Sequence, residues 1–107
     1  MLRYLTEFIN NCRPAWYSGR GFNAYDKKQF ERALRYFKLA QQYSKDDFDP
    51  LIYEHEAFVL FELKRFKESL EKARKSFDQF NSIETKDIKI CESIKRVKSL
   101  IDHLENY

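Results

Sequence analysis

A set of residues recurs along this chain at an offset of about 36 positions, and this recurrence constrains the fold more than any other feature. The recurring pairs are Pro14 and Pro50, Tyr17 and Tyr53, Gly21 and Ala57, Phe22 and Phe58, Tyr25 and Phe61, Lys28 and Lys64, Phe30 and Phe66, Ala33 and Ser69, Leu34 and Leu70, and Ala40 and Ser76. Most are aromatic, small or turn-forming residues, while the residues between them vary. Such a template is typical of a repeated packing unit, which more often offers a surface to a partner than a catalytic pocket.

The composition favours helices over strands. The chain has 107 residues, of which 43% are hydrophobic and 17% aromatic, enough for the core of one domain. It contains only two Gly and two Pro, whereas an all-β fold needs frequent turns. We therefore expect a single all-α domain over residues 1–107.

Apolar residues at helical spacing divide the chain into segments. We expect an N-terminal helix in residues 1–12, a helical pair in 14–44, a second pair in 50–80 and a last helix in 84–105. Thr85 is the expected N-cap of the last helix. Gly19 costs about 1 kcal/mol relative to alanine inside a helix, so we expect a bend or fraying there.

The spacing of small and aromatic residues resembles the tetratricopeptide repeat, a helix–turn–helix unit of about 34 residues. The matching residues are Tyr17, Gly21, Phe30, Ala33 and Ala40 in the first copy, and Tyr53, Ala57, Phe66, Ser69 and Ser76 in the second. Small residues at these places let the helices of a pair approach closely, and the aromatic rings fill the gaps beside them. The resemblance implies stacked antiparallel helix pairs in a short right-handed superhelix, with N-terminal and C-terminal capping helices.

The resemblance also implies where a partner would bind. In this family, the first helices of successive repeats line a concave groove that holds a peptide or helix of another protein. The residues on that face would be Ser18, Phe22, Tyr25 and Asp26 from the first repeat, and Leu51, Glu54, Phe58, Phe61 and Glu62 from the second. Such an apolar groove with an acidic edge suits an amphipathic segment with hydrophobic anchors and basic residues. The leading prediction is a non-catalytic protein–protein interaction module.

Other interpretations stay open. The aromatic residues of this face could be core, covered by the first or last helix of the same chain, since a large exposed aromatic patch is unusual on a monomer. A small helical protein could also serve one cognate protein, as an immunity protein, an antitoxin or a secretion chaperone. The apolar seam of the last helix, Ile90–Leu104, or an end face of the stack, offers a route to a homodimer.

The charge pattern argues against nucleic acid as the first choice of partner. The net charge is only +3, and basic and acidic residues alternate along most of the chain. The locally basic stretch comprises Lys64, Arg65, Lys67, Lys72, Arg74 and Lys75, interrupted by Glu62, Glu68 and Glu71. Nucleic-acid association through this stretch is a further alternative.

No residue pattern indicates an enzyme, a metal site or another cofactor. His55 and His103 have no Cys or His at ligand spacing, and we expect His55 on the solvated surface. Cys12 and Cys91 are too far apart to indicate a disulfide framework, and we expect both as buried, reduced thiols. The sequence shows no signal peptide and no membrane-spanning run, so we expect a cytoplasmic protein without membrane contact.

Overall fold

The computed structural model describes residues 15–43 and 50–106, and the regular secondary structure within these ranges is helical. This confirms the all-α prediction. The chain divides into two compact units, Met1–Phe48 and Asp49–Tyr107. The predicted N-terminal helix in residues 1–12 lies outside the described residues. The single domain and the superhelical stacking stay predictions.

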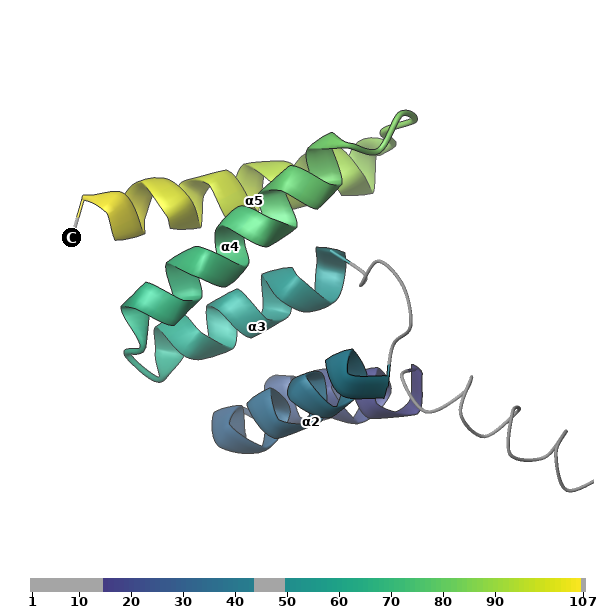
Figure 1. The fold of residues 1–107 in the computed structure, drawn as a ribbon, viewed down its shortest axis with the longest axis vertical. Helices are drawn as coiled ribbons and strands as arrows, with labels where there is room; N and C mark the ends of the chain where they lie inside the picture. The colour runs from purple at the N-terminus through teal and green to yellow at the C-terminus, as the bar shows by residue number, and fades with distance from the viewer. Residues whose placement is uncertain (1–14, 44–49, 107) are drawn as a thin grey trace, which may run out of the picture. The chain divides into compact units, whose positions relative to one another are not determined.

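The first unit contains a helical hairpin. Residues 15–26 form its first helix and α2 (Phe30–Tyr43) its second (Figure 1). The first helix is continuous through Gly19, so the fraying expected there is absent. The buried face of α2 consists of Ala33, Leu34, Phe37 and Ala40, as its helical spacing predicts.

The helices of this hairpin approach closely at Gly21. A Cβ added to Gly21 would lie only 2.6 Å from Cε1 of Phe37, a ring that is fully buried. The prediction that this position requires a small residue is therefore confirmed. The ring of Phe22 packs edge-on beside the same side chain, with ring centroids 5.4 Å apart.

The second unit contains three helices, α3 (Pro50–Glu62), α4 (Phe66–Asn81) and α5 (Ile88–Glu105). The middle helix, α4, packs against both α3 and α5, whereas α3 and α5 meet over a smaller area (Figure 1). The hydrophobic core that they share consists of Ala57, Ala73, Phe80, Val97, Leu100 and Leu104.

Two serines of α4 join it to the backbone of α3. Ser69 Oγ donates a hydrogen bond of 2.6 Å to the carbonyl oxygen of Ala57, and Ser76 Oγ donates one of 2.8 Å to that of Pro50. Both serines are fully buried, so these bonds satisfy hydroxyl groups that would otherwise be costly in the core. The small residues predicted for close helix approach thus also supply polar links between α3 and α4.

The same turn connects the helices of each hairpin. Lys28 and Lys64 both adopt the left-handed conformation, with φ of 60° and 61°. In the first turn the Lys28 amide donates to the Tyr25 carbonyl and the Gln29 amide to that of Ala24, at 2.9 and 2.8 Å. The equivalent bonds in the second turn join Lys64 to Phe61 and Arg65 to Leu60, at 3.0 and 2.9 Å. This pair of bonds is the Schellman motif, which satisfies the last carbonyls of a helix.

The beginning of α5 differs from the prediction. Its N-cap is Asp87 and not Thr85, and the helix starts at Ile88. The Asp87 carboxylate accepts a hydrogen bond of 2.9 Å from the Ile90 amide. A carboxylate here also interacts favourably with the positive end of the helix dipole, an advantage that a threonine hydroxyl lacks.

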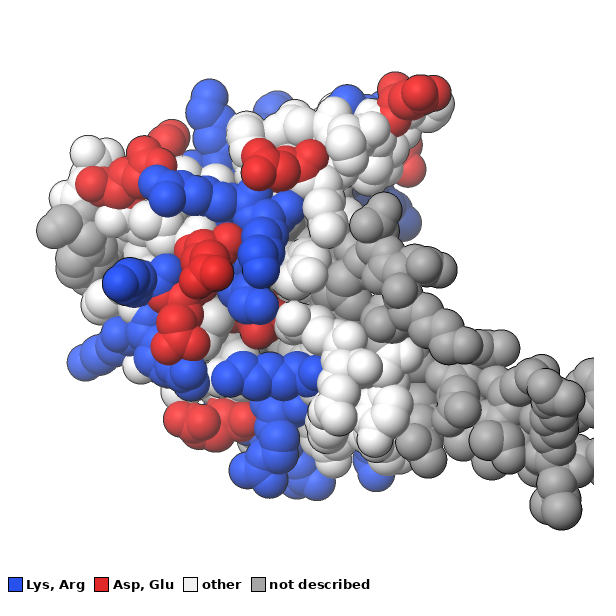
Figure 2. All heavy atoms as spheres, viewed as in Figure 1, with Lys and Arg blue, Asp and Glu red and all other residues white. Residues whose placement is uncertain are grey.

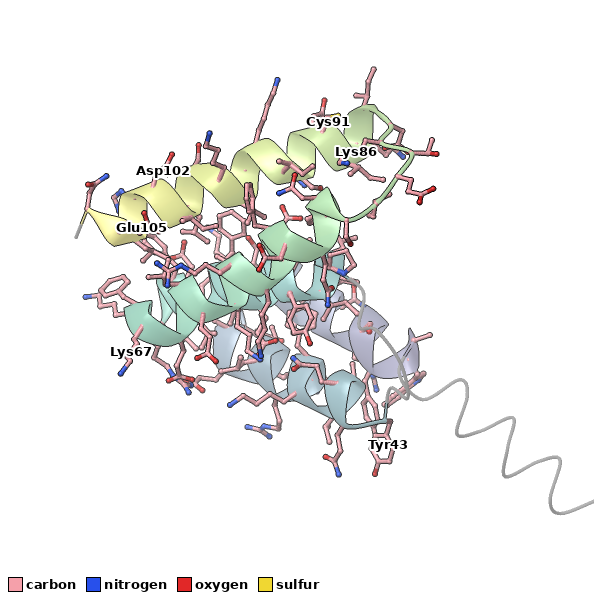
Figure 3. The ribbon with its side chains drawn as sticks, turned by 45° about the horizontal axis from the view of Figure 1, so that its top comes forward. Tyr43, Lys67, Lys86, Cys91, Asp102 and Glu105 are labelled. Carbon is pink, nitrogen blue, oxygen red and sulfur yellow. The ribbon has the colours of Figure 1, made fainter. Side chains whose placement is uncertain are left out.

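Cys91 is exposed on α5, so the expectation of a buried thiol is wrong for this residue. The core side of α5 carries Val97, Leu100 and Leu104. Cys91 and Asp102 lie on the side of α5 that faces away from α4 (Figure 3). Cys12 lies outside the described residues.

The two glycines of the first hairpin provide a matched pair of substitutions. Gly21→Ala should lower the free energy of unfolding by about 1–3 kcal/mol, because its methyl group would clash with the buried Phe37 ring. Gly19→Ala should raise it by about 0.5–1 kcal/mol, since the space around the new Cβ is open and alanine favours helix. Urea unfolding followed by circular dichroism measures both changes. Equal effects of the two substitutions would contradict the close approach at Gly21.

The left-handed lysines provide a second test. Lys64→Gly should raise the free energy of unfolding by about 0.5–1 kcal/mol, because glycine adopts a positive φ without a steric penalty. The control is Glu71→Gly, at an exposed position within α4, which should lower the free energy of unfolding by about 1 kcal/mol. A loss of stability in Lys64→Gly would contradict the left-handed conformation of this residue.

Candidate functional site

The predicted groove residues fall into both compact units. Ser18, Phe22, Tyr25 and Asp26 belong to the first unit, and Leu51, Glu54, Phe58, Phe61 and Glu62 to the second. In each unit these residues lie on the first helix of the hairpin, as the resemblance implies. Their assignment to a partner-binding groove stays a prediction.

In the second unit, α5 contacts this face. Leu51, Phe58 and Phe61 are partly buried and pack against the core to which α5 contributes Val97 and Leu100. The ring of Phe61 also meets that of His103 edge-on, with centroids 5.5 Å apart. Of the two interpretations left open for these aromatic residues, cover by the chain's last helix is favoured here.

A buried carboxylate anchors the contact between α3 and α5. Glu54 is only 1% exposed, and its Oε1 accepts a hydrogen bond of 2.8 Å from Nε of Arg96. The second oxygen of Glu54 has no hydrogen-bond partner among the described residues. Arg96 is held in place by a further bond of 2.8 Å to the hydroxyl of Ser93. Because a buried charge is costly without a partner, Arg96 is the main support of this carboxylate.

In the first unit, the corresponding residues pack within their own hairpin, but most of them remain partly exposed to solvent. Ser18 is buried, Phe22 and Tyr25 are half-buried, and Asp26 is exposed. The ring of Tyr25 meets that of Phe30 edge-on across the turn, at 6.1 Å between centroids. Phe61 and Phe66 form the same contact in the second unit, at 5.5 Å. The repeat therefore extends from the backbone turn to the rings that cover it.

Three of the six basic residues in the stretch considered for nucleic acid have acidic partners within their own unit. Its ion pairs are Arg65 with Glu68, Lys72 with Glu56 and Arg74 with Glu105, at 2.7, 3.7 and 3.0 Å. Lys and Arg side chains lie among Asp and Glu side chains on the face shown in Figure 2. Since Arg65, Lys72 and Arg74 are already paired, the stretch presents less free positive charge than its sequence indicates, and nucleic-acid binding through it has less support.

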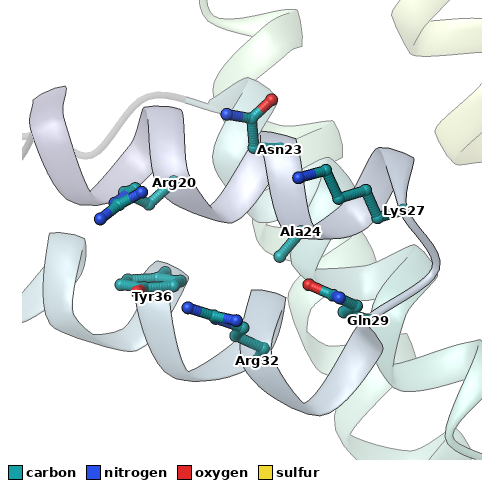
Figure 4. A pocket seen from close by; sticks show the side chains of 7 residues that line it. All are labelled: Arg20, Asn23, Ala24, Lys27, Gln29, Arg32 and Tyr36. Atoms are coloured by element: carbon teal, nitrogen blue, oxygen red, sulfur yellow. The ribbon is translucent and has the colours of Figure 1, made fainter.

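A pocket of about 90 Å³ lies between the two helices of the first unit, and the residue pattern does not predict it (Figure 4). Three cations line it, Arg20 from the first helix, Lys27 from the turn directly after that helix and Arg32 from α2, together with the ring of Tyr36. The sequence does indicate that Arg20 and Lys27 lie on the same side, because residues seven positions apart share a helix face. The position of Arg32 beside them depends on the turn, which residue spacing alone does not reveal.

Two further observations concern chemistry and membranes. The part of the chain that the structure describes holds no cluster of three or more His, Cys, Asp or Glu side chains placed to bind a metal ion. His55 is half-buried, with Nδ1 lying 2.9 Å from the Leu51 carbonyl oxygen, so its expected place on the solvated surface is only partly met. No helix among residues 15–43 and 50–106 is both long and apolar enough to cross a membrane.

Comparison of the chain with protein-family models, with curated proteins and with solved structures gives no match. The likeness to tetratricopeptide repeats stays a prediction, which the residue spacing and the two matching turns support.

The pairing of Glu54 with Arg96 can be tested by a double-mutant cycle. Arg96→Leu should lower the free energy of unfolding by about 1–3 kcal/mol, because it leaves a buried carboxylate without its donor. Replacing Glu54 and Arg96 together by leucine should cost clearly less, since no unpaired charge remains. Arg74→Leu is the control. Its pair with Glu105 is about half-exposed, so the loss should be about 0.5 kcal/mol. Additive effects at positions 54 and 96 would contradict the pairing.

Proposed function

We propose that this chain is a non-catalytic interaction module of the tetratricopeptide type that binds an amphipathic helix of a partner protein. The contact of α5 with α3 in the second unit carries this proposal. The last helix combines an apolar seam with the basic Arg96, and α3 meets it with aromatic rings and the buried Glu54. An amphipathic helix with a basic residue is the class of ligand that the sequence predicts for this face.

The repeat places similar side chains on the first unit. Phe22 corresponds to Phe58 and Tyr25 to Phe61 at the same offset, and Asp26 corresponds to Glu62. A partner helix could place hydrophobic anchors against the two rings and pair a lysine or arginine with the exposed carboxylate of Asp26. The first unit is therefore the place where we expect a partner of this class to bind.

The chemistry of this face indicates the class of partner, an amphipathic helix with a basic residue. A dedicated complex with one cognate protein and a general adaptor role differ in stoichiometry, because the first yields a single partner in a fixed ratio. We place this function in the cytoplasm. The apolar seam of α5 packs within its own unit, so self-association would need an end face of the stack. Light scattering on the purified chain detects such a homodimer.

Substitution of Phe22 tests the proposal. Phe22→Ser should abolish capture of the partner from extracts of the source cells, detected by cross-linking and mass spectrometry, because it removes the central aromatic anchor. The melting temperature should change little if the ring serves a partner. Ile88→Ser is the control, since this side chain is 76% exposed at the beginning of α5 and its loss should leave capture intact.

Two results would contradict the proposal. Capture that survives in Phe22→Ser would exclude this face as the binding site. A large drop in melting temperature would assign Phe22 to the core of its own hairpin, beside Phe37.

A further inference from the structure

We propose that the pocket of the first unit binds the dianion of a phosphate group, either as free phosphate or as a phosphomonoester. This function is independent of the helix-binding face, because the pocket is lined by other residues. Figure 4 shows Arg20 on the first helix, Lys27 at the end of that helix and Arg32 on α2, with the pocket between them.

The charge of the lining is the first argument. The described residues that line the pocket include three cations and no carboxylate. No ion pair within the described part of the chain involves Arg20, Lys27 or Arg32, in contrast to the paired cations of α4. Three cations around one small space give it a positive potential that attracts an anion, and a dianion there can contact more than one of them.

The position of the guanidinium groups is the second argument. The Arg20 guanidinium lies 4.9 Å from the ring centre of Trp16, and that of Arg32 lies 5.9 Å from the ring centre of Tyr36. Stacking on a ring restricts the side chain, so less entropy is lost when the donors bind an anion. The guanidinium group donates two parallel hydrogen bonds to oxyanions, which favours phosphate over a spherical ion such as chloride.

The size of the pocket limits the ligand. A volume of about 90 Å³ is far below the roughly 300–1,000 Å³ of pockets that enclose drug-sized molecules. A tetrahedral oxyanion fits this scale, and the rest of a monoester would lie outside. The amide side chains of Asn23 and Gln29 also line the pocket and can donate to the remaining oxygens of the phosphate.

Titration of the full chain with inorganic phosphate at pH 7.5 and low chloride, followed by calorimetry, tests the proposal. We expect saturable binding at one site. Arg32→Gln should weaken the affinity about tenfold, as the loss of a charge-assisted bond predicts. Arg35→Gln, on the same helix but outside the pocket lining, should leave the affinity nearly unchanged. Lys27→Gln provides a second variant, with about threefold to tenfold weaker binding expected, should Arg32→Gln fail to fold.

Two further arms identify the ligand. Phosphate should bind several-fold more weakly at pH 5.5 than at pH 7.5, because its dianion takes up a proton between these two pH values, whereas sulfate stays a dianion and should not change. If phenyl phosphate binds as tightly as phosphate, the ligand is a phosphomonoester. If phenyl phosphate does not bind, the ligand is the free phosphate ion. Absence of saturable binding would overturn the proposal. Equal weakening by Arg32→Gln and Arg35→Gln would also overturn it, since that result indicates general attraction to a basic helix.

Discussion

Close approach of paired helices at small residues is the constraint on which both halves of this structure depend. In the first hairpin, the missing side chain of Gly21 leaves the space that the Phe37 ring occupies. In the second, Ser69 comes close enough to α3 to bond a backbone carbonyl oxygen, that of Ala57. A larger residue at either place would push the helices apart and open voids beside the aromatic rings, which protein cores do not tolerate.

The two hairpins reach this contact by related but different chemistry. The first uses Ala33 and Ala40 where the second uses Ser69 and Ser76. The serine hydroxyls donate to carbonyl oxygens of α3, which adds direction to a contact that alanine makes by shape alone. An unpaired serine in the core would be destabilising, so the hydroxyls require that α4 keep one register along α3.

The sequence predicted the parts of the fold that depend on short-range signals. Helical spacing located the helices, and the echo of small residues located the contacts within each hairpin. The residue pattern predicts the wrong N-cap for α5, because Thr85 and Asp87 are both good N-cap residues and only the path of the chain selects the carboxylate. The bond between Arg96 and Glu54 joins residues 42 positions apart and depends on how α5 lies on α3. Spacing rules carry no information on such a contact.

If the 36-residue echo is a repeated helical hairpin with one shared turn, solution NMR should detect that turn and the helix contact in both copies. Backbone coupling constants report φ at Lys28 and Lys64, and nuclear Overhauser effects report whether Gly21 touches the ring of Phe37. We expect φ near 60° at both lysines and strong contacts between the Gly21 α-protons and the ring. A negative φ at either lysine, or an absent contact at Gly21, would contradict the repeated hairpin.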